Sequence, residues 1–409
     1  MEMSEKSGVF SGLKVASFCW AVVGPLTMKY LADYGATVVR VETSKRPCIM
    51  RISAPYKDGQ PGLDRSGYFN HFSANILSLS LSMDNPRALE VARRLVAESD
   101  VVMENFTPGV MEKWGLGYEE LQKVKPDIIM LRQSGFGAWG PYAHLPAFGM
   151  ILAAMAGLPD FIGWPDGGPL PLGISPYTDC ISPRFATAAL IAALDYRNKT
   201  GKGQMLDLSQ LETALYFIMH ALLDYAVNGR EPPRIGNSCP DAAPHGVYPC
   251  QGDDRWCTIA VSSDEQWVKL CKVIGKSEYI DDPRFNTLPN RKKREDEINE
   301  LISGWTVNFT PEEVMEQMQS AGVPAGVVKN AADIYDDPQL RQRNLFWPLQ
   351  HPDMGLFTHL GQSFELSKTP AQAYMPSPRL GEHTEYVCTK ILGMTDEEFV
   401  ELAGAGVFD

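Results

Sequence analysis

The sequence predicts an α/β protein with a mostly parallel, doubly wound sheet in roughly its first 200 residues. Short apolar runs alternate there with segments of helical periodicity, and parallel strands require helical crossovers of that kind. The chain has 409 residues, of which 44% are hydrophobic, and this is more core than one domain usually holds. A second domain is therefore expected after Gly229, where the sequence becomes rich in proline and glycine.

The expected strands are short apolar runs, and helical patterns separate them. In chain order the strands are 13–18 (LKVASF), 36–42 (ATVVRVE), 78–81 (SLSL), 100–105 (DVVMEN), 127–132 (DIIMLR) and 205–209 (MLDLS). The clearest helices between them are 25–35 (PLTMKYLADYG) and 86–99 (PRALEVARRLVAES). Ser209 and Glu212 form a capping box that opens a long helix over 210–229.

Asp179 precedes a segment with two signals for a helix start. Ser182 can cap a helix and Pro183 fits its first turn, so a helix is expected from Pro183 to about Tyr196. This places Asp179 in a loop near the positive end of the helix dipole. The stretch alone allows two interpretations, a solvated loop residue or a functional carboxylate.

Composition excludes several classes of function. The chain has 37 basic and 50 acidic residues, a net charge of −13, so its surface as a whole should repel nucleic acid and anionic membranes. The basic run 291–296 (RKKRED) is expected to be a solvated helix face. The first ten residues do not resemble a signal peptide and the most apolar runs are too short to span a bilayer, so a cytoplasmic protein is expected. The eight cysteines include no zinc-site spacing, which implies reduced thiols and no metal.

Common catalytic motifs are absent. The segment after the first strand has only Gly24, followed by proline, so the dinucleotide fingerprint GxGxxG is missing. The GxSxG motif of serine hydrolases is missing as well, and the seven histidines fall in no motif that pairs one with a nucleophile. Carboxylate chemistry remains.

Five blocks of the sequence resemble the family III CoA-transferases, and they follow that family's order along essentially the whole chain. The blocks are GPLTMKYLADYGATVVRVE, ENFTPGVMEKWGLGYEELQKVKPDIIMLRQSGFGAWGPY, ALIAALDYRNKTGKGQMLDLSQLETAL, AGVPAGVVKN and PSPRLGEHTEYV. The resemblance implies interlinked ring-like subunits, each with a Rossmann-like large domain and a smaller α+β domain. It also implies that Asp179 is the catalytic aspartate, because Asp179 stands where the family has that residue.

The resemblance completes the domain prediction. Residues 1–220 form the first part of a large CoA-binding domain, 230–335 form the small domain, and 340–409 return to complete the large one, since the block PSPRLGEHTEYV is a large-domain signature. The expected partners are acyl-CoA and carboxylic acid substrates. The expected oligomer is an interlinked homodimer, or a heterodimer with a paralogous subunit.

A carboxylate nucleophile suits CoA transfer for a general chemical reason. Attack on a thioester carbonyl gives a mixed anhydride, which stays as reactive as the thioester, whereas a serine ester would lie too low in energy. Water would destroy the anhydride, so the site must close over it. No tightly bound cofactor is expected, because the CoA thioester is itself the substrate.

Several residues match nucleotide-pocket positions of the family. These are Lys113, Asn105, Phe106, Gly135 and Phe136, and the arginines Arg40 and Arg51 are further candidates that lie nearby in sequence. Other positions depart from the family pattern. Ile76 and Leu77 occupy places that are often basic, and Asp84 and Ser134 replace lysines that some members use. Other residues therefore form the nucleotide pocket, or a non-identical partner subunit supplies part of the contacts to CoA.

Two further departures bear on the reaction. Racemases of the same superfamily use a His/Asp pair, but their GHD segment reads Phe148-Gly149 here, and His144 is displaced from that place and expected on the surface. A transferase is therefore favoured over a racemase. In place of the family's glycine-rich active-site loop the chain has GNSCPDAAPHGVY, in which Gly236 and Gly246 can act as hinges, so a lid of another kind is expected.

The resemblance extends to the branch that acts on aromatic succinates such as benzylsuccinate, with succinyl-CoA as donor. A non-catalytic scaffold subunit that supports a paralogous partner is the alternative from a different class. The altered lysine positions favour the scaffold, and Asp179 favours the enzyme.

Overall fold

The computed structural model describes residues 8–173 and 176–409, and these divide into two compact units. Unit 1 consists of the described residues within 1–159, 171–231 and 340–409, and unit 2 consists of 160–170 and 232–339. The chain thus leaves unit 1 twice. The short excursion 160–170 carries no signal in the sequence. That the units are independently folding domains stays a prediction.

Unit 1 is built on a six-stranded parallel sheet, which confirms the mixed α/β class. The strands are β1 (Lys14–Ser17), β2 (Thr37–Glu42), β3 (Leu77–Ser80), β4 (Val101–Glu104), β5 (Ile129–Ser134) and β6 (Met205–Ser209). They lie in the order β3-β2-β1-β4-β5-β6, and each neighbouring pair is parallel. This is a doubly wound order, and all six carboxyl ends lie at one edge of the sheet, where such folds bind ligands.

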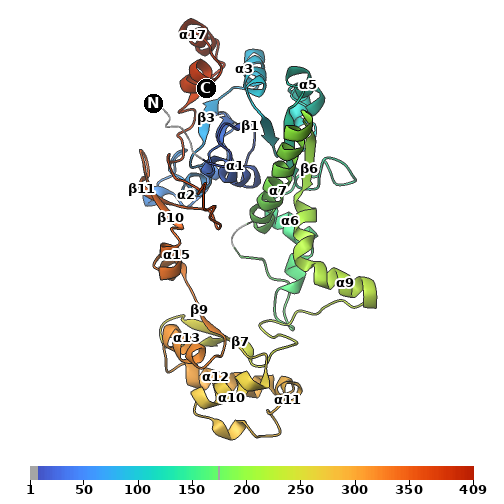
Figure 1. The fold of residues 1–409 in the computed structure, drawn as a ribbon, viewed down its shortest axis with the longest axis vertical. Helices are drawn as coiled ribbons and strands as arrows, with labels where there is room; N and C mark the ends of the chain where they lie inside the picture. Colours follow the sequence, from blue (N-terminus) through green and yellow to red (C-terminus); the bar gives the residue numbers. More distant parts are fainter. Residues whose placement is uncertain (1–7, 174–175) are drawn as a thin grey trace. The chain divides into compact units, whose positions relative to one another are not determined.

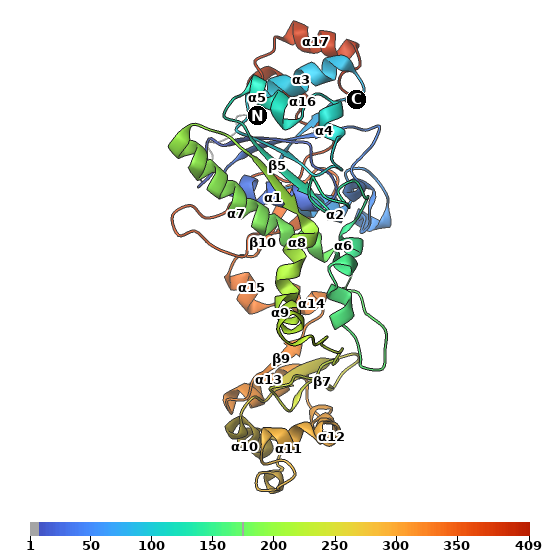
Figure 2. The ribbon, with the colours of Figure 1, turned by 90° about the vertical axis from the view of Figure 1, so that its right-hand side faces the viewer.

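Helices cover both faces of this sheet (Figures 1 and 2). On one face α1 (Val23–Asp33) and α7 (Tyr177–Thr200) bury Met28, Leu31, Ala186 and Leu190 against the strands. On the other face α3 (Pro86–Ala97), α5 (Tyr118–Val124) and α17 (Asp396–Gly404) enclose a second core cluster. Strand residues such as Ile129 and Met130 therefore alternate between two apolar cores, as a sheet buried on both faces requires.

Unit 1 has further helices of at most ten residues. They are α2 (Gly67–Phe72), α4 (Val110–Lys113), α6 (Gly149–Met155), α8 (Gln210–Leu215), α9 (Met219–Asn228), α15 (Pro338–Gln342) at the boundary with unit 2, and α16 (Thr384–Tyr386). The C-terminal segment also adds an antiparallel hairpin of β10 (Phe346–His351) and β11 (Gly355–Leu360). Beyond it, Ser78 of β3 donates its N–H to His383 and accepts the His383 N–H through its carbonyl, which fastens the returning chain to the sheet edge.

Unit 2 has its own sheet and core. Its antiparallel strands are β7 (His245–Pro249), β8 (Trp256–Ala260) and β9 (Ala325–Val328), and its helices are α10 (Asp264–Val273), α11 (Leu288–Lys292), α12 (Glu295–Thr306), α13 (Pro311–Ser320) and α14 (Ala331–Tyr335). Trp267, Phe285 and Ile302 are fully buried in this core. Gly246 pairs with Ile259 inside β7, so the prediction that Gly246 acts as a hinge is wrong.

The start of α7 also differs from the prediction. The helix begins at Tyr177, so Asp179 lies in its first turn and not in a loop, and Pro183 lies inside the helix. Ser182 does not cap, because its hydroxyl hydrogen-bonds Thr213 Oγ1 at 2.6 Å. Packing of the buried residues 178, 179, 181 and 182 stabilises the extra turn and outweighs the one backbone hydrogen bond that Pro183 cannot donate.

The helix expected over 210–229 is interrupted. Ser209 accepts the Glu212 N–H at 3.2 Å and caps α8, so the predicted capping box is present in its Ser209 half only. A 3₁₀ turn, η4 (Tyr216–Ile218), separates α8 from α9. Gly229 ends α9 in the left-handed conformation (φ 65°). Among the helices of the described ranges 8–173 and 176–409, none has the length and apolar character needed to cross a bilayer.

Candidate active site

The Asp179 side chain is 7% exposed and lies against the first residues of two helices. The backbone N–H groups of Val23, the first residue of α1, and of Gly149, the first residue of α6, are close enough to its carboxylate to favour the ionised form. N–H groups at a helix start have no partner within the helix, so they are free to hold a carboxylate. Three helices, α1, α6 and α7, thus converge on one carboxyl group.

Burial dominates the proton affinity of Asp179. Desolvation raises its pKa to about 7, and the two backbone hydrogen bonds offset only part of that rise. The titratable neighbours that sense its charge are Tyr68 of α2 and Cys180 of α7, whose pKa values are raised by burial first and by Asp179 second. A carboxyl group that is desolvated and only partly compensated is typical of functional sites.

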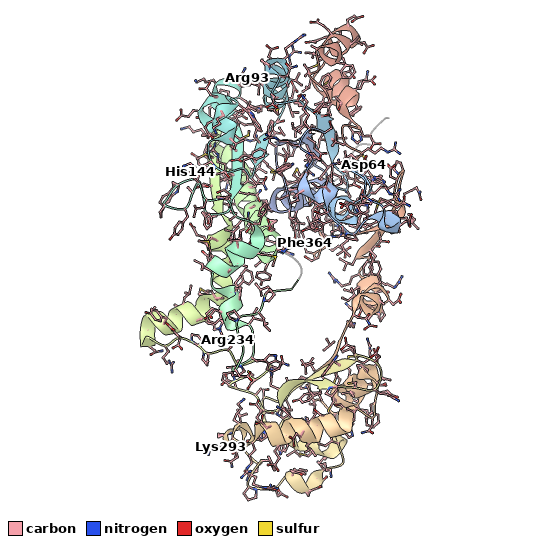
Figure 3. All side chains as sticks on the ribbon, turned by 180° about the vertical axis from the view of Figure 1, so that it is seen from behind. Asp64, Arg93, His144, Arg234, Lys293 and Phe364 are labelled. Atoms are coloured by element: carbon pink, nitrogen blue, oxygen red, sulfur yellow. The ribbon has the colours of Figure 1, made fainter. Side chains whose placement is uncertain are left out.

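Gly149 leaves room for the carboxylate. A Cβ atom at this position would lie 2.1 Å from Asp179 Oδ2 and 2.4 Å from Pro176 Cβ, closer than real contacts allow. The preceding Phe148 is 64% exposed. Phe148 and Gly149, the pair compared above with the GHD segment of the racemases, thus place a phenyl ring and a backbone N–H at the start of α6. His144 is exposed on the loop between β5 and α6 (Figure 3).

A cavity of about 330 Å³ lies at the carboxyl ends of β1 to β4. Its apolar wall includes Phe18, Trp20, Phe106 and Trp114, and the last two rings meet edge to face with their centroids 5.5 Å apart. The other lining residues are Val41, Glu42, Thr43, Lys45, Arg46, Leu81, Ser82, Met83, Asp84 and Val110. Aromatic walls with basic side chains at the rim suit a nucleotide that carries phosphates.

The predicted nucleotide residues fall into separate groups. Phe106 lines this cavity, and Lys113 ends α4, between the lining residues Val110 and Trp114. Gly135 and Phe136 instead follow β5 and lie toward α6, since a Cβ on Gly135 would be 3.2 Å from Leu152 of α6. Asn105 is committed to protein, because its amide holds both backbone groups of Trp20.

The two arginines are buried. Arg51 is 0% exposed and binds Glu42 through two nitrogens at 2.8 and 2.9 Å and Asp64 at 2.6 Å, and Figure 3 marks Asp64. This network lowers the pKa of Glu42 to about 2, because the nearby Arg40 and Arg51 charges outweigh the effect of burial. The Arg51 guanidinium is therefore engaged by carboxylates inside the protein. This geometry gives no support to the expected contact between Arg51 and CoA.

Arg40 differs from Arg51 in its partners. It is 1% exposed, its Nε lies 3.8 Å from Glu42, and its guanidinium carbon lies 5.3 Å from the centroid of the Phe69 ring. The departures from the family pattern are explained in part. Ile76 and Leu77 are core residues with 0% and 1% exposure, whereas Asp84 lines the cavity.

Sequence reasoning missed several contributors to these sites, among them the cavity-wall residues Phe18, Trp20 and Trp114. Val23 and Gly149 act through backbone N–H groups, which leave no trace in residue type. Lys45 and Arg46 follow β2 directly, and a basic pair at the carboxyl end of a parallel strand was a usable signal. Within residues 8–173 and 176–409 no three His, Cys, Asp or Glu side chains cluster as metal ligands.

Comparison with known proteins identifies relatives along nearly the whole chain. The sequence model described as CoA-transferase family III matches residues 10–384. The succinyl-CoA–D-citramalate CoA-transferase of Chloroflexus aurantiacus is 33% identical over 93% of this chain and 93% of its own. The succinyl-CoA–L-malate CoA-transferase beta subunit of the same organism is 29% identical over 96% of each chain. A CaiB/BaiF family protein from Brucella suis superimposes with a TM-score of 0.86, at 28% identity over 94% of this chain and 100% of its own.

Proposed function

The chain belongs to CoA-transferase family III, and we propose that it moves CoA from an acyl-CoA donor to a carboxylic acid acceptor with Asp179 as the nucleophile. That it is an enzyme of the CoA-transferase class follows from the family and the curated relatives. The observation that carries the mechanism is the buried Asp179 carboxylate, whose ionised form two backbone N–H groups favour. Cys180 is the adjacent thiol, and burial raises its pKa, which disfavours the reactive thiolate.

The proposed reaction keeps the acyl group activated throughout. Asp179 attacks the donor thioester carbonyl, the C–S bond breaks, and CoA leaves as thiolate from a mixed anhydride. The acceptor carboxylate then attacks the Asp179 carbonyl carbon, which releases the donor acid and forms a second anhydride. The CoA thiolate attacks the acceptor acyl carbon, which gives the new thioester and restores the Asp179 carboxylate.

The environment of Asp179 supports this role. A pKa near 7 makes the carboxylate more basic than a solvated aspartate, and nucleophilicity rises with basicity, while much of it remains ionised at neutral pH. Exclusion of water from the buried carboxylate protects an anhydride from hydrolysis. The N–H groups of Val23 and Gly149 hold the group without using a side chain that could itself react.

The nucleotide of CoA is assigned to the cavity at the carboxyl ends of β1 to β4. Phe18, Phe106 and Trp114 supply an apolar wall for the adenine, while Lys45 and Arg46 offer positive charge to the phosphates. Lys113, the last residue of α4, is proposed as a further phosphate contact. Glu42 does not repel the phosphates strongly, because Arg51 and Arg40 neutralise it.

For the substrates we propose succinyl-CoA as donor and an aryl-substituted dicarboxylate as acceptor. Both curated relatives named above carry succinyl-CoA in their names. Exposed aromatic side chains on the elements around Asp179 favour an acceptor with a ring, namely Phe148 before α6, Phe185 on α7, and Tyr216 and Phe217 in η4. Phe148 replaces the histidine that a racemase would need, which disfavours that alternative reaction.

Screening acceptors with succinyl-CoA tests the function directly. The wild-type protein should convert a carboxylic acid to its CoA thioester, with release of succinate detected by mass spectrometry. Asp179→Ala and Asp179→Asn should lose transfer and keep the fold. Hydroxylamine should trap Asp179 only when acyl-CoA is present. Near-wild-type turnover by either variant, or trapping at another residue, would remove Asp179 from the mechanism and favour the scaffold interpretation.

A dimer is proposed as the working state. Helix α9 has ten residues and only Ala221 is buried, while Leu223, Tyr225 and Val227 are at least 55% exposed. Met150 and Met155 of α6 are also exposed apolar residues of unit 1. Exposed apolar side chains that gather on the surface of a folded domain mark protein–protein interfaces. A second copy of this chain is the proposed occupant, and a paralogous subunit is the alternative, since one relative is named as a beta subunit.

A further inference from the structure

The segment that follows α17 lies against the rim of the nucleotide cavity. The Val407 carbonyl accepts the Ser82 N–H at 2.9 Å, and Val407 is 0% exposed. The Asn85 amide donates to the Ala405 carbonyl at 2.9 Å. Because Ser82 lines the cavity and Asn85 caps α3 close by in the chain, the segment is fixed at the rim at two points before it reaches Asp409.

Two hydroxyl groups at the carboxyl ends of β2 and β3 hold the Asp409 carboxylate. Thr43, which follows β2, donates its hydroxyl to Asp409 Oδ2, and Ser80, the last residue of β3, donates to Asp409 Oδ1 at 2.5 Å. The Ser80 hydroxyl also lies 2.7 Å from the main-chain oxygen of Asp409. Burial raises the pKa of Asp409, but hydrogen bonds to the charged form, among them those from Ser80 and Thr43, outweigh burial and bring the pKa below its usual value. The group is therefore a carboxylate at neutral pH.

Asp409 is one hydrogen bond away from the lining of the cavity. Thr43 lines the cavity and donates to Asp409, and the Lys45 N–H donates to Thr43 Oγ1 at 3.3 Å. The Lys45 ammonium group, which is proposed to bind phosphate, donates to the hydroxyl of Ser82 on the same rim. The carboxylate therefore contacts the segment 43–46, which carries the lining cations Lys45 and Arg46.

A carboxylate at this place opposes the binding of a phosphate. Both groups are anions that accept hydrogen bonds from hydroxyls and attract the same cations, and like charges repel each other. The lining carboxylate of Glu42 has little such effect, because Arg51 and Arg40 neutralise it. The partners that hold Asp409 are hydroxyl groups, which leave its negative charge in place.

From this geometry we propose that Asp409 is an internal competitor for the phosphate groups of the nucleotide, because its carboxylate occupies the anion position formed by Thr43 and Ser80 at the basic end of the cavity. A nucleotide that enters must displace the carboxylate or bind against its repulsion, so its affinity is lower than the lining cations alone would give. The proposal rests on the proposed function only for the identity of the ligand as CoA, since the competition acts on any nucleotide phosphate in this cavity.

Calorimetric titration of the full-length protein with ADP tests the competition. Asp409→Asn keeps the size of the side chain and removes its charge, so it should bind ADP about three- to tenfold more tightly than the wild type at low salt, with a smaller gain at high salt. Asp409→Glu keeps the charge and should bind ADP within about twofold of the wild type. Adenosine, which has no phosphate, should bind Asp409→Asn and the wild type equally. A gain in affinity is not an effect of a damaged fold.

Asp396→Asn is the matched control. Asp396 is an exposed carboxylate in the first turn of α17, and the substitution changes the net charge by the same amount as Asp409→Asn. The control should leave the affinity for ADP unchanged. An equal gain in the control would show an effect of net charge alone and would overturn the proposal.

The competition and the proposed function fail in different ways. Unchanged or weaker ADP binding by Asp409→Asn overturns the competition, and so does the absence of ADP binding by both the variant and the wild type. If the wild-type protein transfers no CoA to any acceptor, the proposed function fails, but the ADP titration still decides the role of Asp409. If transfer occurs while Asp409→Asn binds ADP as the wild type does, only the competition fails.

Discussion

Asp179 is subject to two opposing requirements. As a nucleophile it must be ionised, yet burial with only two backbone donors makes ionisation costly and raises its pKa to about 7. No ion pair of Asp179 is present in the described structure to offset this cost, and the two backbone N–H groups offset only part of it. Burial of the carboxylate therefore raises its nucleophilicity and at the same time lowers the stability of the folded protein.

The first prediction concerns the pH dependence of catalysis. Below pH 7 the free enzyme holds Asp179 protonated and unreactive, so kcat/KM for the acyl-CoA donor should rise about tenfold per pH unit and level off above pH 7. Initial rates between pH 5 and 9 at constant ionic strength measure this. A profile that is already flat between pH 5 and 7 would contradict a buried carboxylate as nucleophile.

The second prediction concerns stability. A pKa raised from 3.8 to about 7 on folding means that the folded state binds the proton more tightly, so stability is lost as pH rises from about 4 to 7 and is constant above. Asp179→Asn removes this loss. Its stability relative to wild type should increase by roughly 2–4 kcal/mol between pH 4 and pH 8, measured by urea unfolding. If the difference in unfolding free energy between Asp179→Asn and wild type is the same at pH 4 and pH 8, folding does not raise the pKa of Asp179.

At the residue scale, side-chain chemistry was predictable and backbone chemistry was not. Asp179 and Phe106 were named from the sequence because their residue types matched a family pattern, and their roles in catalysis and nucleotide binding stay predictions. The N–H groups of Val23 and Gly149 could not be named, since every residue except proline has one and only the fold aims it. Arg51 was a candidate for CoA binding or an ordinary structural arginine, and its hydrogen bonds to Glu42 and Asp64 in the core agree with the structural alternative.

At the element scale, the start of α6 determines the shape of the carboxylate site. Gly149→Ala places a Cβ 2.1 Å from Asp179 Oδ2, so the helix or the carboxylate must move. We expect kcat to fall about 100-fold and stability to drop by about 1–3 kcal/mol. Gly404→Ala in α17 is the matched control, because a Cβ there meets nothing within 4 Å, and it should keep full activity. Wild-type kcat in Gly149→Ala would mean that the carboxylate does not need this position.

The segments that follow β2 and β4 carry the basic side chains proposed to bind the phosphates of CoA. Lys45→Ala combined with Arg46→Ala should weaken ADP and CoA binding by about tenfold or more at low salt and less at high salt, because exposed cations act through screened charge. Lys113→Ala should do the same by about 1–3 kcal/mol. Isothermal titration at two salt concentrations measures both. Lys123→Ala, an exposed lysine of α5 paired with Glu120, should bind normally, and equal weakening in this control would indicate a nonspecific charge effect.

The elements themselves were predicted well where their patterns are periodic. The six strands of the parallel sheet and the helices α1 and α3 lie within a few residues of the expected ranges. The start of α7 was wrong because Ser182 and Pro183 imitate a helix N-terminus, while tertiary packing of residues 178 to 182 extends the helix past them. Local sequence propensity determines where a helix begins only when tertiary packing does not favour another start.

At the scale of the whole molecule, the sequence indicated two regions but not the short excursion 160–170. That segment groups with unit 2 through bonds such as Gly236 N–H to the Gly163 carbonyl at 3.0 Å, and such a contact links positions far apart in sequence. The apolar face of α9 was equally hard to interpret. Its sequence predicted a helix, but which side remains exposed depends on what the rest of unit 1 covers.

The last prediction therefore concerns that face. Leu223 and Val227, 55% and 77% exposed, lie one helical turn apart on α9, and burying such side chains contributes about 1.5–3 kcal/mol each. If a second copy covers them, Leu223→Asp with Val227→Asp should convert a dimer to monomers in sedimentation velocity. Val400→Asp, an equally exposed apolar position on α17 (67%), should leave the dimer intact. A monomeric wild type would refute the homodimer and favour a paralogous partner, because an apolar face of this size needs a cover. A dimer that survives the double substitution would place the interface elsewhere on unit 1 or on unit 2.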